Sequence, residues 1–591
     1  MKYFFAQTKK RQQISQSGDY TMTSDICLKT SIFVNQIKKS SITWGLTLSF
    51  LLINSFIPTS LLAKENLEIE DFDYWKSLCK LLGEEKEFAE AITACNQAIS
   101  LKPEDPEIWV ERTEILVQQA KYTEALVSAD RALRLQSTYS LALAQRCQAL
   151  LNLGKYEEAV AACDLALRSD QNWGTNTAVL AWYNRGLAQN KLGQFTEAIA
   201  SFNRALVINP ENSLALVGNC QALAKLGKFA EAINACDLAI TTNKNWGNSS
   251  PAIAWFHKGL AQKQNGQLPA AITSFDQAIA TNPQDADIWL EHGIALSLVE
   301  KIAQASVSYE FAVKLNPNYS LALAHQSANL NKLGKHEEAQ KASEAAIQGD
   351  NRWGNMSPAL AWEQRGIAVA GLGNYEEGLT SLERAIALNP NYAEAWNNRA
   401  VTQWYLGRYS EALTSSDRAT ELNPQYTQAW FNKGRMLRTL KRYPAALAAY
   451  DKALENSSQI MDKLLLANIW ANRSVVLWNL SRNQEALVSV DRAIGINPEL
   501  SQAWYNRGVV LLDLKRYSEA IIAYNRASSL TPDNANILVG QGIALLKVGR
   551  IAEAIASFEK TLELDPENTL AQANQDIAQK RLLELEKQNS K

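Results

Sequence analysis

The sequence is poor in residues that interrupt regular structure, with 27 glycines and 15 prolines among 591 residues. It also lacks an excess of positive charge: 59 Lys and Arg stand against 61 Asp and Glu, which argues against a nucleic-acid partner. Hydrophobic residues make up 47% and charged residues 20%, which excludes a wholly disordered, collagenous or polytopic membrane chain. The bulk of the chain is therefore expected to be folded.

Signatures of catalytic and metal sites are missing as well. The chain holds four histidines, and neither an H-E-x-x-H nor a C-x-x-C motif occurs. No glycine-rich phosphate-binding loop opens a helix pattern. We therefore expect no enzyme, no metal site and no cofactor.

One uncharged apolar stretch stands near the N-terminus. Residues 1–40 carry seven basic and two acidic side chains, residues 41–63 carry no charge, and residues 64–71 are acidic. The pattern predicts a basic, disordered leader, then a signal peptide or a single membrane anchor, then a linker. Ala63 suits cleavage whereas Leu61 does not, so both interpretations stay open, and a buried core helix is a third. Either of the first two places the rest in a periplasmic, luminal or extracellular compartment.

From residue 72 onward the sequence repeats itself. The pattern starts at about 72, 106, 140, 179, 213, 252, 286, 320, 359, 393, 427, 467, 501 and 535, in steps of 34, 39 or 40 residues. The fourth position of a unit is most often Trp, and ten of the sixteen tryptophans stand there. Self-similarity with this period is typical of a repeat protein rather than of separate compact domains.

Small residues recur at fixed places in each unit. Position 8 is small, position 20 is Ala except for Gly378, and position 27 is Ala except for Thr561. Several units have Gly at position 15 and nine have Pro at position 32, which fit the ends of two helices. Each unit is therefore predicted as helix, tight turn, helix and stop, with close helix contacts at the small positions.

The W-x-x-x-G string, an aromatic residue around position 17, an A-x-x-x-F/Y string and a terminal Pro resemble the tetratricopeptide repeat over residues 72–568. The resemblance implies an all-α fold, a right-handed α-solenoid (superhelix) of fourteen repeats in which each helix pair buries its apolar face against its neighbours. Residues 569–591 are predicted to form a polar capping helix and tail, as the open end of a solenoid requires.

Three of the longer steps share an inserted tryptophan followed by Gly: Trp173, Trp246 and Trp353. In one interpretation each side chain folds back over its own helix ends. In the other, the three form a row of exposed anchors for a partner along one edge of the solenoid.

Six of the seven cysteines stand in pairs 16 residues apart, at positions 8 and 24: Cys79 and Cys95, Cys147 and Cys163, Cys220 and Cys236. Export would favour three disulfides. Helix geometry favours free cysteines that act as small core residues. If position 8 faces position 20, position 24 lies one turn further, outside the Cα window of about 4.4–6.8 Å for a disulfide.

In the family that the sequence resembles, the first helix of each repeat lines a concave groove. Position 6 is Asn in Asn184 and in four consecutive repeats, at Asn398, Asn432, Asn472 and Asn506. They resemble the asparagine ladder of O-GlcNAc transferase, without its catalytic domain, which implies amides that hold the backbone of an extended peptide. An exposed Asn in a copied W-x-N-R-G string is the alternative. The flanking residues expected to add apolar contacts are Phe431, Tyr505, Trp404 and Trp478.

The predicted function is a noncatalytic scaffold that binds an extended segment of a protein or peptide in its groove. It is expected to be exported, or anchored in a membrane through residues 41–63. The alternative is a targeting or substrate-presenting subunit of a separate transferase or protease, which a co-purified enzyme would reveal. Self-association by end-to-end stacking is a third interpretation. The basic clamp of chaperone-binding relatives is not expected, since Lys76 alone stands at its first basic position.

Overall fold

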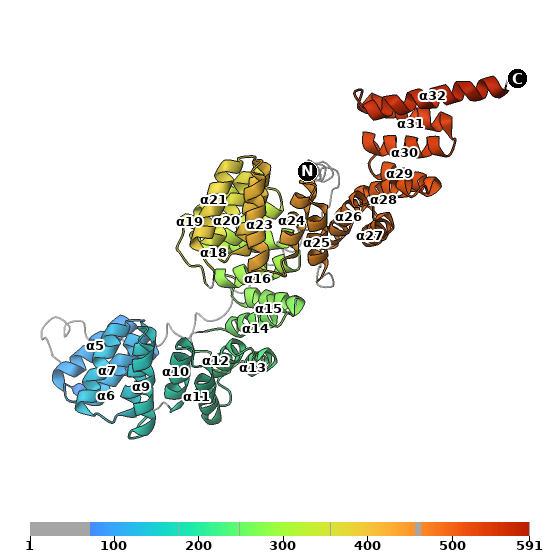
Figure 1. Cartoon of the computed structure of the whole chain (residues 1–591). Helices are drawn as coiled ribbons and strands as arrows, with labels where there is room; N and C mark the ends of the chain where they lie inside the picture. The colour runs from blue at the N-terminus through green and yellow to red at the C-terminus, as the bar shows by residue number, and fades with distance from the viewer. Residues whose placement is uncertain (1–70, 175–176, 248, 355, 456–461, 590–591) are drawn as a thin grey trace, which may run out of the picture. The chain divides into compact units, whose positions relative to one another are not determined.

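The computed structural model describes residues 71–174, 177–247, 249–354, 356–455 and 462–589 (Figure 1). These residues form helices and no strand, which confirms an all-α fold. The predicted leader, the apolar stretch at 41–63 and all but the last residue of the linker lie outside the described residues. Within the described part, no helix combines the length and the apolar character needed to cross a membrane.

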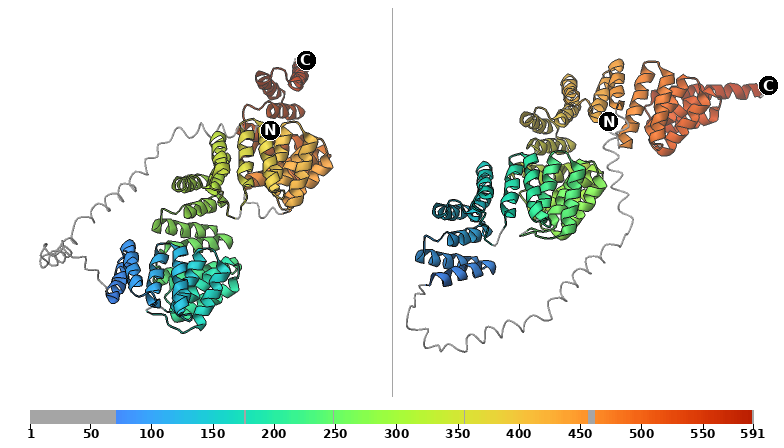
Figure 2. Two further views of the ribbon diagram at one scale, coloured as in Figure 1. Left: turned by 90° about the vertical axis from the view of Figure 1, so that its left-hand side faces the viewer. Right: turned by 90° about the horizontal axis from the view of Figure 1, so that it is seen from below.

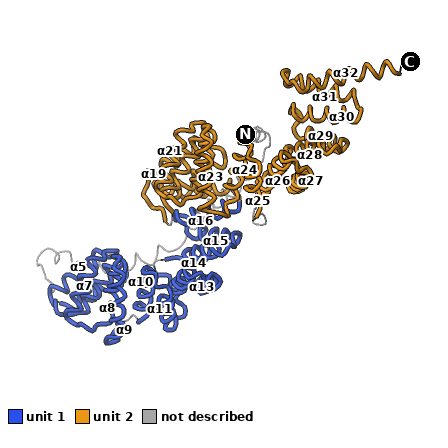
Figure 3. Tube along the Cα trace, in the orientation of Figure 1, with its two compact units in different colours: residues 1–299 blue, residues 300–591 orange. Residues whose placement is uncertain are grey.

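The chain divides into two compact units, residues 1–299 and residues 300–591 (Figure 3). In unit 1 the helices are α4 (Phe72–Glu84), α5 (Phe88–Leu101), α6 (Pro106–Gln118), α7 (Tyr122–Leu135), α8 (Ser140–Asn152), α9 (Tyr156–Arg168), α10 (Val179–Lys191), α11 (Phe195–Ile208), α12 (Ser213–Lys225), α13 (Phe229–Thr242), α14 (Ala252–Gln264), α15 (Leu268–Thr281) and α16 (Ala286–Leu298).

In unit 2 the helices are α17 (Ile302–Leu315), α18 (Ser320–Lys332), α19 (His336–Gln348), α20 (Ala359–Gly371), α21 (Tyr375–Leu388), α22 (Ala393–Tyr405), α23 (Tyr409–Leu422), α24 (Thr427–Thr439), α25 (Tyr443–Leu454), α26 (Lys463–Asn479), α27 (Asn483–Ile496), α28 (Ser501–Asp513), α29 (Tyr517–Leu530), α30 (Ala535–Lys547), α31 (Ile551–Leu564) and α32 (Thr569–Asn589). Within each unit, first helices (even numbers) alternate with second helices (odd numbers), each packed on its neighbours along the chain (Figures 1 and 2).

The first helices begin where the sequence period predicts, with one exception. Helix α26 begins at Lys463, four residues before the predicted start, because the Asp462 side chain accepts hydrogen bonds from the backbone N–H groups of Leu464 and Leu465. The turn inside a pair places one residue at positive φ. Glycine fills it at Gly154, but Lys86 and Ala120 adopt the same conformation, so glycine alone does not mark the turn.

The tryptophan at position 4 fastens one repeat to the next. A proline stands six residues before five of the ten tryptophans, and there the indole Nε1 donates to the proline's carbonyl oxygen, for example from Trp396 to Pro390 and from Trp430 to Pro424, both at 2.9 Å. The proline that ends a second helix thus supplies the acceptor for the following first helix. The recurrent tryptophan and the recurrent proline of the sequence therefore form a contact with each other in the structure.

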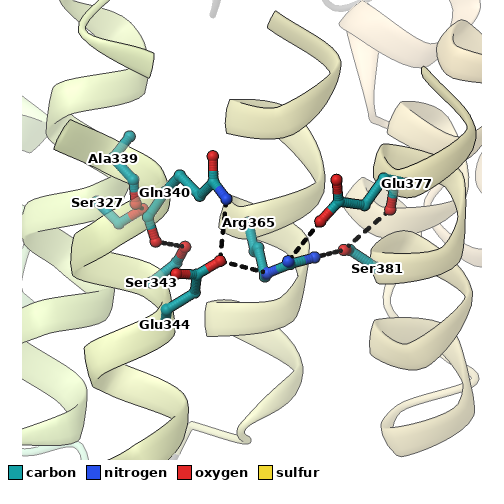
Figure 4. A network of polar contacts seen from close by, with 8 residues as sticks. All are labelled: Ser327, Ala339, Gln340, Ser343, Glu344, Arg365, Glu377 and Ser381. Carbon is teal, nitrogen blue, oxygen red and sulfur yellow. Dashed lines mark hydrogen bonds and ion pairs between the residues drawn. The ribbon is translucent and has the colours of Figure 1, made fainter. Parts of the chain in front are cut away.

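A basic residue at position 7 joins three helices. Arg365 on α20 donates through Nε to Glu344 on α19 at 3.1 Å and through Nη1 to Ser381 on α21 at 2.7 Å (Figure 4). Its Nη2 also donates to Glu377 on α21 at 2.6 Å. Planar guanidinium groups suit this multiple bonding. The polar contacts of position 7 therefore link the second helix of one repeat to the pair that follows.

Positions 8 and 24 of a repeat face each other directly. A Cβ atom on Gly434 would lie 2.5 Å from the ring of Tyr450, and one on Gly508 would lie 2.7 Å from the ring of Tyr524. Both tyrosines are fully buried. The absent side chain of glycine therefore makes room for a ring on the facing helix.

The cysteine pairs occupy the same two positions and form three disulfides in unit 1. The Cα atoms lie 5.0 Å apart for Cys79 and Cys95, 5.4 Å for Cys147 and Cys163, and 5.5 Å for Cys220 and Cys236. The expectation from helix geometry, that position 24 is too distant, is wrong. Position 24, not only position 20, approaches the small residue at position 8, so the pair falls inside the disulfide window.

The contact between positions 8 and 24 can be tested at Gly508 and Tyr524. Gly508→Ala should lower the free energy of unfolding by roughly 1–3 kcal/mol because the methyl group meets the ring. Tyr524→Ser should cost roughly 3–5 kcal/mol through the cavity that it leaves. The double variant recreates the pairing found at Ala400 and Ser416, so its loss should be smaller than the sum of the two.

Chemical denaturation of the full chain measures these three values. Gly495→Ala is the matched control, because no atom lies within 4 Å of the added Cβ and alanine favours the helix. Additive losses in the double variant, or an equal loss at Gly495, would contradict direct packing of the two positions.

Candidate functional site

The predicted asparagines join neighbouring first helices. Three of the four consecutive amides donate from Nδ2 to a residue 35 positions earlier, on the preceding first helix: Asn398 to Glu363 Oε1 at 2.8 Å, Asn432 to Asn397 Oδ1 at 2.9 Å, and Asn506 to the Ala471 carbonyl at 3.1 Å. Asn472 instead donates to the Asn468 carbonyl within α26, at 2.8 Å. Position 6 therefore lies at the seam between two repeats.

Burial limits what these amides can hold. Asn184, Asn432 and Asn506 are 2%, 8% and 5% exposed. The structure thus corrects the expectation of four successive amides on an open surface, because side-by-side packing of first helices covers two of them. Peptide binding by Asn398 and Asn472, which are half-buried, stays a prediction.

The four predicted aromatic residues divide into two classes. Trp404 and Phe431 are 7% and 5% exposed and belong to the core; the Trp404 ring centre lies 4.5 Å from that of Tyr409. The expectation that these two offer contacts to a partner is therefore wrong. Trp478 and Tyr505 are half-buried and keep accessible surface.

Trp478 and Tyr505 line a pocket of about 530 Å³ in unit 2. Its walls come from α26, α28, α29, α30 and the start of α32, and include Val509 and Ile543. Asp513 lies in the wall, and its Oδ2 accepts a hydrogen bond from the Trp478 indole at 2.5 Å, which holds that ring in place. Apolar and polar atoms share the lining almost equally, so the pocket can take an apolar group that stands beside a polar or charged one.

A second polar feature of unit 2 is the buried carboxyl group of Glu363 on α20. It is 3% exposed and accepts hydrogen bonds from Tyr392 Oη at 2.5 Å, Asn398 Nδ2 at 2.8 Å and Gln364 Nε2 at 3.1 Å. Asn397 links this group to the amide of Asn432. The resulting network crosses the first helices α20, α22 and α24.

Burial raises the pKa of Glu363 to about 7, against an ordinary value of 4.5. The hydrogen bond from Tyr392 opposes the rise, and the nearby charge of Glu394 adds to it. The carboxyl group therefore changes its charge near neutral pH. The sequence analysis missed Glu363, because its hydrogen-bond partners Tyr392 and Asn398 stand 29 and 35 residues further along the chain and meet it only in the folded structure.

The connector tryptophans pack toward the ends of their own repeats. Trp353 is 7% exposed, so its interpretation as an exposed anchor is wrong. Asp350 holds this connector by accepting from the backbone N–H groups of Ser320, at the start of α18, and Arg352. Trp173 and Trp246 are half-buried against apolar neighbours, and partner binding by these two stays a prediction.

Two lysines on first helices of unit 1 are paired with acids of the same unit. Lys76 Nζ donates to Glu107 Oε2 at 2.5 Å and lies 3.6 Å from Asp105, and Lys263 pairs with Glu291. Lys76, at the first basic position of the chaperone-type clamp, is thus already paired with acids of the same chain. Nowhere among the described residues do three or more His, Cys, Asp or Glu side chains gather as a metal site would require.

Comparison with known proteins gives the repeat its family. Family models described as "Tetratricopeptide repeat" match residues 114–176, 217–286, 256–298 and 399–459, residues 179–212, and residues 499–567. A model described as "TPR repeat" matches residues 370–407. Together the matches are spread over both units.

Curated relatives match a part of the chain. The Hsp70-Hsp90 organizing protein 1 of Glycine max is 26% identical over 241 residues, which are 35% of this chain and 41% of that protein. Tetratricopeptide repeat protein 33 of Mus musculus is 35% identical over 106 residues, 18% of this chain and 37% of the relative. The chain thus covers about two fifths of the length of these relatives. The solved APC/C hetero-tetramer Cut9-Hcn1 is 16% identical with a TM-score of 0.46, over 88% of this chain and 97% of the other.

The raised pKa of Glu363 predicts a pH-dependent stability. Between about pH 4.5 and pH 7 the folded chain binds more protons than the unfolded chain, so the free energy of unfolding falls as the pH rises through this window. Glu363→Gln cannot ionise and should remove this part of the fall, which amounts to roughly 3 kcal/mol.

Urea unfolding of both proteins between pH 4.5 and pH 8 measures the difference. Glu559→Gln, at an exposed helical position, should follow the original protein at every pH. Parallel pH profiles for Glu363→Gln and the original protein would show that the pKa of Glu363 is the same in the folded and the unfolded chain.

Proposed function

Because this chain belongs to the tetratricopeptide repeat family, we propose that it is a noncatalytic scaffold for protein–protein interaction, which holds an extended partner segment against the first helices of unit 2. The observation that carries the proposal is the pocket where Trp478 and Tyr505 remain accessible. Accessible Trp and Tyr side chains beside a pocket are the usual anchors of a protein interface. The name of the Glycine max relative, an organizing protein for Hsp70 and Hsp90, supports a protein partner.

The pocket suits one apolar side chain of the partner. Val509, Leu512 and Ile543 supply apolar wall, and its volume of about 530 Å³ exceeds that of a single large side chain. Asp513 and Glu567 lie in the same lining and give it a negative edge. An apolar residue next to a basic residue therefore matches the pocket better than one next to an acid.

Truncation of the pocket rings tests the scaffold function. Peptides of 15 residues that bind the full chain are first selected from a random library. Their affinity for the Trp478→Ala variant, and for the Tyr505→Ala variant, should be at least about 10-fold lower, since interface tryptophan and tyrosine carry much of the binding energy. Fluorescence anisotropy with the selected peptides measures the loss.

Ile522→Ala, an exposed apolar position of α29 outside the pocket, is the matched control and should bind normally. Unchanged melting curves exclude an indirect effect of unfolding. Full affinity in the double variant of Trp478 and Tyr505 would refute this site.

The compartment is a second part of the proposal. The repeats lie on the far side of a membrane from the cytoplasm, and they are either exported or anchored there through residues 41–63. Two observations support it. One is the basic stretch followed by an uncharged apolar one. The other is the set of three disulfides in unit 1, since such bonds persist in oxidising compartments.

Thiol labelling tests the compartment. In protein taken from its native cells and unfolded without reductant, the six cysteines of unit 1 should resist maleimide and react only after reduction. N-terminal sequencing of the same sample separates cleavage near Ala63 from a retained anchor. Six reactive thiols in the unreduced sample would contradict export.

A further inference from the structure

Two arginines of α24 have no carboxylate partner among the described residues. Arg435 and Arg438 are half-buried at positions 9 and 12 of their repeat. By contrast, Arg473 and Arg507, at position 7 of the next two first helices, each donate to an aspartate at 2.7 Å. Two arginines side by side without an acid are therefore a local excess of positive charge.

Arg435 and Arg438 stand at positions 9 and 12 of their repeat, and residues at these two positions of the following first helices line the pocket. Val509 at position 9 of α28, and Trp478 and Leu512 at position 12 of α26 and α28, all belong to the pocket wall. Arg435 and Arg438 hold the corresponding places on α24. A segment that follows the first helices beyond the pocket would meet these two guanidinium groups.

Tyr450 on α25 adds an unpaired hydroxyl group. The residue is 0% exposed, and its Oη has no hydrogen-bond partner in the described part of the chain. Its ring centre lies 6.1 Å from that of Phe431, over which the Arg435 guanidinium stands at 5.7 Å. Buried hydroxyl groups are nearly always paired, so this one shows that hydrogen-bond acceptors are scarce around the two arginines.

The electrostatic surroundings of Arg435 agree with this. Burial lowers its pKa, and Arg438 lowers it further, whereas Tyr450 and Tyr405 are the groups that favour its charge. Tyr405 comes from α22, where its ring stacks on Tyr375 at 5.0 Å. The groups near the guanidinium are thus two phenols and a second guanidinium, and of these Tyr405 and Arg438 keep accessible surface from which they can donate to a bound anion.

We propose that Tyr405, Arg435 and Arg438 form a subsite for an oxyanion of the bound partner segment, the carboxylate of an acidic side chain or the phosphate of a phosphorylated one. The inference rests on the proposed function for the existence of a bound segment. It adds that this segment carries a negative charge where it meets α24. Guanidinium groups bind both oxyanions through paired, charge-assisted hydrogen bonds.

Three peptide libraries test the subsite. Each is a pool of 15-residue peptides with degenerate flanks and a fixed central residue, which is Glu, phosphoserine or Gln. The full chain should capture the Glu pool, the phosphoserine pool or both at least about 10-fold better than the Gln pool, in line with a charged hydrogen-bonded pair. The better of the two charged pools identifies the oxyanion.

Variants assign the preference to the named residues. Arg435→Gln with Arg438→Gln should abolish the preference and leave capture of the Gln pool unchanged. Tyr405→Phe should weaken the preference several-fold. Arg418→Gln, an exposed arginine of α23 that pairs with Glu421, is the matched control and should keep it.

The outcomes separate the two proposals. Capture of all three pools with equal strength overturns the subsite and leaves the scaffold function standing, whereas capture of none refutes both. A preference that survives the double arginine variant also overturns the subsite. The melting temperature of the double arginine variant should be unchanged or higher, because the substitutions remove two like charges that have no acidic partner. A large fall in melting temperature would indicate a structural role of the arginines instead.

Discussion

The direct approach of positions 8 and 24 is the constraint on which the rest of the structure depends. Two helices joined by a tight turn come close only where one of them lacks a bulky side chain. The chain meets this condition in several ways: Gly434 with Tyr450, Ala400 with Ser416, Ser327 with Ser343, or a disulfide. Because each pair keeps this spacing, the next pair finds the same surface to pack on.

Stacking of the pairs then uses up most polar groups at the seams. Trp396 donates to the carbonyl of Pro390, Arg365 links three helices, and three asparagines at position 6, Asn398, Asn432 and Asn506, reach back to the preceding first helix. Trp478 and Tyr505 keep accessible surface, and Arg435 and Arg438 have no carboxylate partner among the described residues. The four lie on three successive first helices of unit 2, which is what suggests an extended partner.

Much of this architecture could be predicted from the period alone. The starts of the first helices, the proline stops and the small positions follow from a repeated pattern, since helix ends and close contacts depend on local residue types. The site was predicted less well. Asn432 and Trp404 stand at positions that the family uses for a groove, yet packing buries both. Glu363 and Tyr450 gave no signal, because their importance comes from residues on other helices.

The sequence by itself determined that this protein is a helical repeat array of the tetratricopeptide type, because periodicity, turn residues and small residues are local properties that a single chain displays openly. The tertiary structure decided which side chains remain available. Whether cysteines 16 residues apart can bond, whether an asparagine faces solvent or a neighbouring helix, and whether an arginine finds an acid depend on the distances between helices. Those distances are set by packing across repeats and cannot be read from spacing along one chain.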